Sequence, residues 1–132
     1  MKFFTVISTL LFPLLVNSQT FSTIIKNGKS NLPVNIIELG EHYFMANNSS
    51  VAQGIINEGY IYKLNKQGQV LDSLIFNDGT DNEIFRLINR NDSLICVDLK
   101  TDHTDSVSIN YRVFDENFNE LLVNSIKSSI PP

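Results

Sequence analysis

Tyr60-Ile61-Tyr62-Lys63-Leu64-Asn65-Lys66-Gln67-Gly68-Gln69-Val70-Leu71 is the stretch of the chain that decides the fold class. Short apolar runs stand on both sides of the turn Asn65-Lys66-Gln67-Gly68, which ends in a glycine where a positive φ is needed. The pattern predicts a tight hairpin that joins strands over residues 60–65 and 69–76. After residue 18, apolar residues nowhere recur at helical spacing for long enough to form a helix of ordinary length. The sequence therefore predicts an all-β protein.

Similar short runs, bounded by Asn, Asp, Gly and Ser, occur along the whole chain after residue 18 and indicate further strands. The expected strands cover residues 21–26, 34–39, 43–46, 60–65, 69–76, 84–89, 93–99, 107–114 and 118–126. Asp115-Glu116-Asn117 is expected to form a second tight turn, with Asn117 in the left-handed conformation that asparagine tolerates.

Residues 34–76 and 84–126 show the same order of strands and turns, which indicates an internal repeat with a period of about 49 residues. Aligning the two halves places Tyr62 on Tyr111 and Leu64 on Val113. Leu71 falls on Leu121 if one residue is added in the second turn. The expected division is a signal peptide (1–18), a leading strand and linker (19–33), two four-stranded antiparallel repeats (34–80 and 81–127) and a tail (128–132). A small β-sandwich is the alternative architecture.

The hairpin at residues 61–71, together with the loop at residues 78–84, resembles the blade hairpin and inter-blade loop of secreted bacterial β-propeller repeat proteins. The chain departs from that pattern at Asn65, where the family usually has aspartate, and it has no tryptophan. The resemblance implies blade-like sheets that serve as a scaffold or a binding surface. A closed propeller needs at least four such sheets. Two sheets are therefore expected to belong to a longer protein, to assemble with copies of the chain, or to face each other as a sandwich.

The first residues resemble a secretory signal peptide. Met1-Lys2 begins the chain, residues 3–16 are apolar or small, and Asn17-Ser18-Gln19 ends the run. Cleavage is expected after Ser18, with an uncleaved anchor as the alternative. The predicted location is secreted, periplasmic or in the cell envelope, without a membrane attachment after cleavage. A formal charge of −4 argues against nucleic acid as a partner.

The sequence contains no strong catalytic, cofactor-binding or metal-binding motif, so none of these sites is predicted. Cys96 lies in an apolar run and is expected to be a buried, reduced thiol. The acidic stretch at residues 78–83 is interpreted as a solvated turn rather than a calcium loop. Residues 100–106 are interpreted as a polar loop, in preference to a metal cluster of Asp98, Asp102, His103 and Asp105.

The expected function is that of a non-catalytic β-repeat module that binds protein or glycan, with self-association through open sheet edges as a further possibility. The alternative is an N-terminal fragment of a larger secreted enzyme whose active site lies outside this chain. Tyr43, Tyr60, Tyr62 and Tyr111 are candidates for a ligand-stacking face, although core or cross-strand packing is the favoured explanation for each. Ser73, Ser93 and Ser106 follow aspartate in candidate O-glycosylation motifs, and Gly68 and Asn117 are the candidate structural turn residues.

Overall fold

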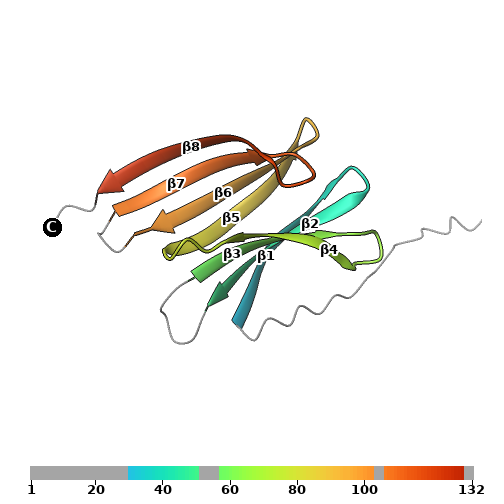
Figure 1. Cartoon of the computed structure of the whole chain (residues 1–132), viewed down its shortest axis with the longest axis horizontal. Helices are drawn as coiled ribbons and strands as arrows, with labels where there is room; N and C mark the ends of the chain where they lie inside the picture. The colour runs from blue at the N-terminus through green and yellow to red at the C-terminus, as the bar shows by residue number, and fades with distance from the viewer. Residues whose placement is uncertain (1–29, 51–56, 103–105, 130–132) are drawn as a thin grey trace, which may run out of the picture.

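The computed structural model describes residues 30–50, 57–102 and 106–129, which form eight β-strands and no helix. The strands are β1 (Ser30–Leu39), β2 (His42–Ser50), β3 (Asn57–Leu64), β4 (Val70–Phe76), β5 (Asp81–Arg90), β6 (Ser93–Thr101), β7 (Ser106–Phe114) and β8 (Glu120–Ser129). Strands β1–β4 form sheet A and β5–β8 form sheet B, and each strand pairs with its neighbours in sequence (Figure 1). The prediction of an all-β protein with two four-stranded antiparallel units is confirmed.

The ends of the two sheets differ from the expected boundaries. β1 begins at Ser30 rather than at Val34, because Pro33 is tolerated in an edge strand and a bulge follows it. β8 runs to Ser129, so the expected tail is shorter than residues 128–132. The expected signal peptide and the leading strand at residues 21–26 lie outside the described residues.

The two sheets are copies of one structural unit, since each carries the same two β-bulges. In sheet A the register shifts at Val34 in β1 and at Leu71 in β4. In sheet B it shifts at Phe85 in β5 and at Leu121 in β8. Because a bulge changes the twist and direction of its strand, matching bulges indicate matching shapes.

The structure corrects the expected alignment of the two repeats by one residue. The two hairpin turns have equal length, with Asn65 N donating to Gln69 O and Asp115 N donating to Asn119 O. No residue is added in the second turn. Leu64 therefore corresponds to Phe114 rather than to Val113, and the counterpart of Tyr62 is Arg112 rather than Tyr111. A shift of one residue places each aligned side chain on the opposite face of the sheet.

The turn positions also differ in part from expectation. Gly68 has a φ of 79°, and its N–H donates to Asn65 O at 3.0 Å. In the second turn the left-handed residue is Phe118, with a φ of 62°, and not Asn117. The Phe118 ring packs edge-on against Phe44 of sheet A, with 5.7 Å between centroids. This contact offsets the unfavourable backbone conformation of a residue with a side chain.

The core lies between the sheets, and it joins unlike faces of the two units. We define the front face of sheet A by Phe44, Ala46 and Ile61, and the front face of sheet B by the counterparts Ile95, Val97 and Tyr111; the opposite face of each sheet is its back face. The core contains the front face of sheet A and the back face of sheet B, including Leu87, Leu94, Cys96 and Phe114. The sheets therefore pack head to tail, that is, with the front face of sheet A against the back face of sheet B.

Edge strand β5 is fixed to sheet A by two asparagine side chains. Asn35 Nδ2 donates to Leu87 O at 3.0 Å, and Leu87 N donates to Asn35 Oδ1 at 2.9 Å. Asn48 makes the same pair of bonds with Ile84, at 2.9 and 2.8 Å. These amides form hydrogen bonds with backbone N–H and C=O groups of β5, which an unprotected sheet edge would offer to another strand.

Gly59 allows the close approach of the sheets at this point. A Cβ atom at residue 59 would lie 2.8 Å from Ile84 Cγ1, closer than side-chain carbons can come. Gly59 thus sets the spacing at which the asparagine amides reach β5.

Candidate functional site

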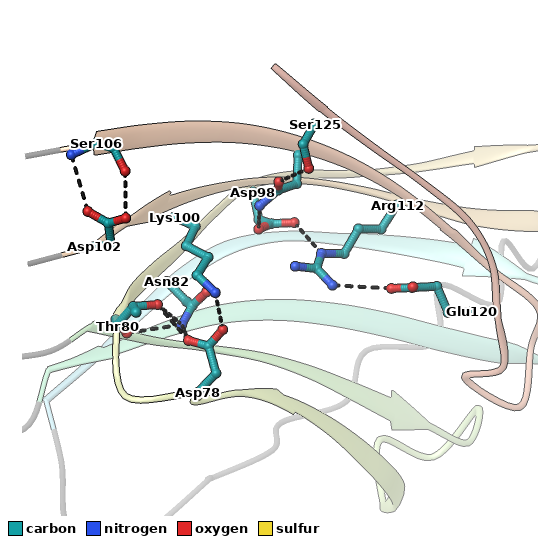
Figure 2. A network of polar contacts seen from close by, with 11 residues as sticks. Asp78, Thr80, Asn82, Asp98, Lys100, Asp102, Ser106, Arg112, Glu120 and Ser125 are labelled. Carbon is teal, nitrogen blue, oxygen red and sulfur yellow. Dashed lines mark hydrogen bonds and ion pairs between the residues drawn. The ribbon is translucent and has the colours of Figure 1, made fainter. Parts of the chain in front are cut away.

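A polar groove of about 340 Å³ lies on the back face of sheet B, beside the apolar core. Its lining consists of hydroxyl, amide and charged side chains, namely Thr80, Lys100, Asp102, Ser106, Ser108, Asn110, Arg112, Ser125 and Lys127. Figure 2 shows that many of these side chains belong to separate groups of hydrogen bonds and ion pairs, around Asp98, Asp78 and Asp102. The sequence alternates polar residues along β6, β7 and β8, so they all point to one face.

The first of these groups is a network centred on Asp98, a fully buried aspartate on β6. Asn110 Nδ2 donates to Asp98 Oδ1 at 2.8 Å, and Arg112 Nε donates to Asp98 Oδ2 at 2.9 Å. Arg112 also reaches Glu120 at 3.2 Å and lies over the Phe76 ring of sheet A. Because each carboxylate oxygen has a donor, the buried charge is compensated.

These partners stabilise the protonated guanidinium group of Arg112. Burial alone would lower the pKa of its guanidinium, but Asp98 and then Glu120 more than offset that effect and raise it. Ser125 Oγ donates to Asn110 Oδ1 at 2.6 Å, which connects β8 to the same network. Three strands of sheet B are therefore tied together beneath the groove.

A second cluster closes one end of the groove from the loop between the sheets. Asp78 accepts hydrogen bonds from Thr80 Oγ1 at 2.5 Å and from Asn82 Nδ2 at 3.0 Å, and it forms an ion pair with Lys100. Burial acts to raise the pKa of Asp78, but the bonds from Lys100, Thr80 and Asn82 hold it below the ordinary aspartate range. Of the acidic stretch predicted to be a solvated turn, residues 78–80 form a loop bonded to sheet B, and residues 81–83 begin strand β5.

The groove offers hydrogen-bond donors and acceptors rather than a reactive group. Ser106 Oγ donates to Asp102 Oδ2 at 2.5 Å. Cys96 is buried beside Asp98, and burial first, then the Asp98 charge, raises its pKa, so the thiol stays protonated. It is a free, buried cysteine, as expected. Chemically, the groove can exchange hydrogen bonds with a small polar ligand.

The front face of sheet B is a second candidate surface, and it is apolar and open. Phe76 on the front face of sheet A is 9% exposed, whereas its counterpart Ile126 is 75% exposed. Ile61 is fully buried, whereas its counterpart Tyr111 is 37% exposed. These two positions of the core in sheet A are therefore left in solvent in sheet B, whereas Ile95, the counterpart of Phe44, is buried. An exposed apolar patch of this kind is typical of an interaction site.

The four candidate stacking tyrosines do not form one surface. Tyr60 and Tyr62 are buried on the back face of sheet A, where their rings stack in parallel with 5.8 Å between centroids. Tyr43 lies on the same face, under the Lys66 ammonium group. Tyr111 belongs to the front face of sheet B. The four rings are therefore divided between two faces on different sheets.

The candidate O-glycosylation serines lie at three separate places. Ser73 is exposed on β4, and Ser93 is half-buried at the start of β6, where its hydroxyl donates to Asn91 O at 3.4 Å. Ser106 lines the groove. His103 and Asp105, which the sequence predicts to lie in a polar loop, are outside the described residues.

Sequence reasoning missed the Asp98–Asn110–Arg112 network. A signal was present, since Asp98 interrupts the apolar residues of β6 and Asn110 and Arg112 are two apart on β7. Recognising the network also requires knowing that Asp98 lies opposite Asn110, which depends on strand register.

Among the described residues there is no group of three or more His, Cys, Asp or Glu side chains placed to hold a metal ion. The same part of the chain has no helix long and apolar enough to cross a membrane. The chain matches no protein-family model, no curated protein and no solved structure.

Proposed function

We propose that this chain is a secreted, non-catalytic β-repeat module of the propeller-blade type, and that it acts as a scaffold by binding protein through the front face of sheet B. The observation that carries the proposal is the open face itself. The same positions that bury Ile61 and Phe76 in sheet A present Tyr111 and Ile126 in sheet B, whereas Ile95, the counterpart of Phe44, is buried. Covering such a face with a protein surface is favourable, by roughly 25 cal/mol for each Å² of apolar area removed from water.

Site-specific photo-crosslinking in the producing cells tests this proposal. A benzophenone amino acid replaces Leu122 or Ile109, both exposed on the front face of sheet B. The control is the same replacement of Leu71, an exposed leucine on β4 of sheet A. We expect protein adducts from the two front-face positions and none from the control; equal labelling at all three, or no adducts at all, contradicts the proposal.

The polar groove favours a second candidate, glycan binding. Its hydroxyl, amide and amino groups match the hydrogen-bonding groups of a sugar, and Lys127 adds a cation for an acidic one. Titration with glucuronate, with glucose as the neutral comparison, should shift the amide NMR signals of Ser108 and Ser125. Signals that stay unchanged at millimolar sugar would exclude this ligand class.

A further inference from the structure

We infer that the protein bound by the front face of sheet B is a second copy of this chain, which places its own front face of sheet B against the first in a two-fold dimer. This inference rests on the proposed function, because it names the partner of the same surface. It is based on the residues that the contact between sheets A and B requires, and on the side chains that make up the open face.

A third sheet cannot add to sheet B in the way that sheet B adds to sheet A. The front face of sheet A holds β5 through Asn35, Asn48 and Gly59. Their counterparts on the front face of sheet B are Arg86, Leu99 and Ile109. The two amides that bind an edge strand are missing, and a bulky side chain replaces the glycine that allows close approach.

A second copy also offers a poor surface for head-to-tail packing. That packing would use the back face of its sheet A, where Tyr60, Tyr62 and Leu64 lie on the central strand β3. All three residues are buried within the chain, and the apolar side chains exposed on this face, Ile36, Val70 and Ile75, lie on the outer strands β1 and β4. The front face of sheet B instead exposes Ile109 and Tyr111 on its central strand β7, where a partner can cover them.

The front face of sheet B is complementary to itself. Its positions on β6, β7 and β8 carry only apolar or neutral side chains: Ser93, Ile95, Val97, Leu99, Thr101, Val107, Ile109, Tyr111, Val113, Leu122, Asn124, Ile126 and Ser128. Charged side chains on this face are confined to β5, at Asp81, Glu83, Arg86 and Arg90. Two copies can therefore face each other over these three strands without placing like charges together.

The size of the face is sufficient for a dimer. All four strands, of about ten residues each, span roughly 30 Å by 19 Å, or about 600 Å² of flat area, of which β6, β7 and β8 supply about three quarters, at the usual rise and strand spacing. A standard protein interface buries about 800 Å² of accessible surface on each partner, and accessible surface exceeds flat area. A two-fold pair also gives a closed assembly, in which the same patch serves both copies.

Two neighbouring residues on β8 provide a matched test. Leu122 points to the front face and is 48% exposed, and Val123 points to the back face and is 46% exposed. Sedimentation equilibrium of the purified secreted chain should show a dimer at micromolar concentration. Leu122→Lys should weaken dimerisation by about tenfold or more, because a two-fold interface contains each buried lysine twice. Val123→Lys should leave it unchanged, and circular dichroism should show that both variants keep the β-sheet spectrum.

A monomeric wild-type chain overturns the inference, as does a dimer that Leu122→Lys leaves intact. Equal weakening by both variants indicates pairing through the β8 edge and also overturns it, as do open-ended polymers. The crosslinking experiment separates this outcome from failure of the proposed function. Front-face adducts to a different protein keep that function and exclude the dimer, whereas adducts between copies of the chain support both.

Discussion

Gly59 is the residue whose missing side chain lets the two sheets meet. Gly59→Ala should destabilise the fold by about 1–3 kcal/mol, because the added Cβ overlaps the Ile84 side chain. Urea denaturation monitored by circular dichroism measures the loss. Ile84→Val in the same chain should recover part of it, since the shorter side chain removes the Cδ1 atom that lies 3.1 Å from the added Cβ. Additive losses in the double variant would show that these two residues do not clash.

Asp78 makes the stability of the folded chain depend on pH. Its pKa is lowered in the folded chain, so the stability it contributes is present above about pH 4, where an unfolded aspartate ionises, and is lost as the pH falls toward the folded value. We expect wild-type stability to fall more steeply than that of Asp78→Asn between about pH 4 and pH 2. The difference should not exceed about 1 kcal/mol, since half of the side chain is exposed. Denaturation curves across this range with equal slopes for both proteins would contradict the assignment.

At the scale of elements, the hairpin of β3 and β4 depends on Gly68. Gly68→Val should cost on the order of 1 kcal/mol or more, because a β-branched residue is strained at a φ of 79°. Gln67→Val, at the exposed neighbouring position of the same turn, is the control and should have a much smaller effect. Thermal denaturation of both variants distinguishes the backbone requirement from a general effect of valine in the turn.

The second element-scale feature is the pair of asparagines that covers the edge of β5. Asn35→Ala and Asn48→Ala each remove two hydrogen bonds and leave backbone groups of β5 without partners, so each should cost about 1–3 kcal/mol. Asn124→Ala, on the front face of β8, serves as the comparison. Native-state hydrogen exchange should show faster exchange of the Ile84 and Leu87 amides in the two variants. Unchanged exchange at these amides would show that the side chains do not protect the edge.

For the whole molecule, the export prediction concerns the first eighteen residues. The short charged start, the apolar run and the boundary at Ser18 predict that the secreted protein begins at Gln19. Mass spectrometry of the protein from the culture medium or the cell envelope should find that terminus. Recovery of intact protein beginning at Met1 in a membrane fraction would instead support the uncleaved anchor.

The sequence by itself determined the strands, their order and their turns. Alternating apolar residues and the Asn and Gly turns depend on the local backbone, so eight of the expected strands appear in the described part of the chain and pair as two meanders. The repeat was visible for the same reason. The match of Leu71 with Leu121 holds in the structure because both are bulge residues.

Only the tertiary structure decided the exact register and the use of each face. Residues 60–62 are apolar on both faces of β3, so alternation could not distinguish Tyr62 from Ile61 as the partner of the core. Tyr62 proved to be on the back face, and Phe118 took the left-handed position because the Phe44 ring lies beside it. Local sequence shows that a residue is apolar, but its burial depends on which distant strand covers it. Head-to-tail packing covers the front face of sheet A and leaves that of sheet B open.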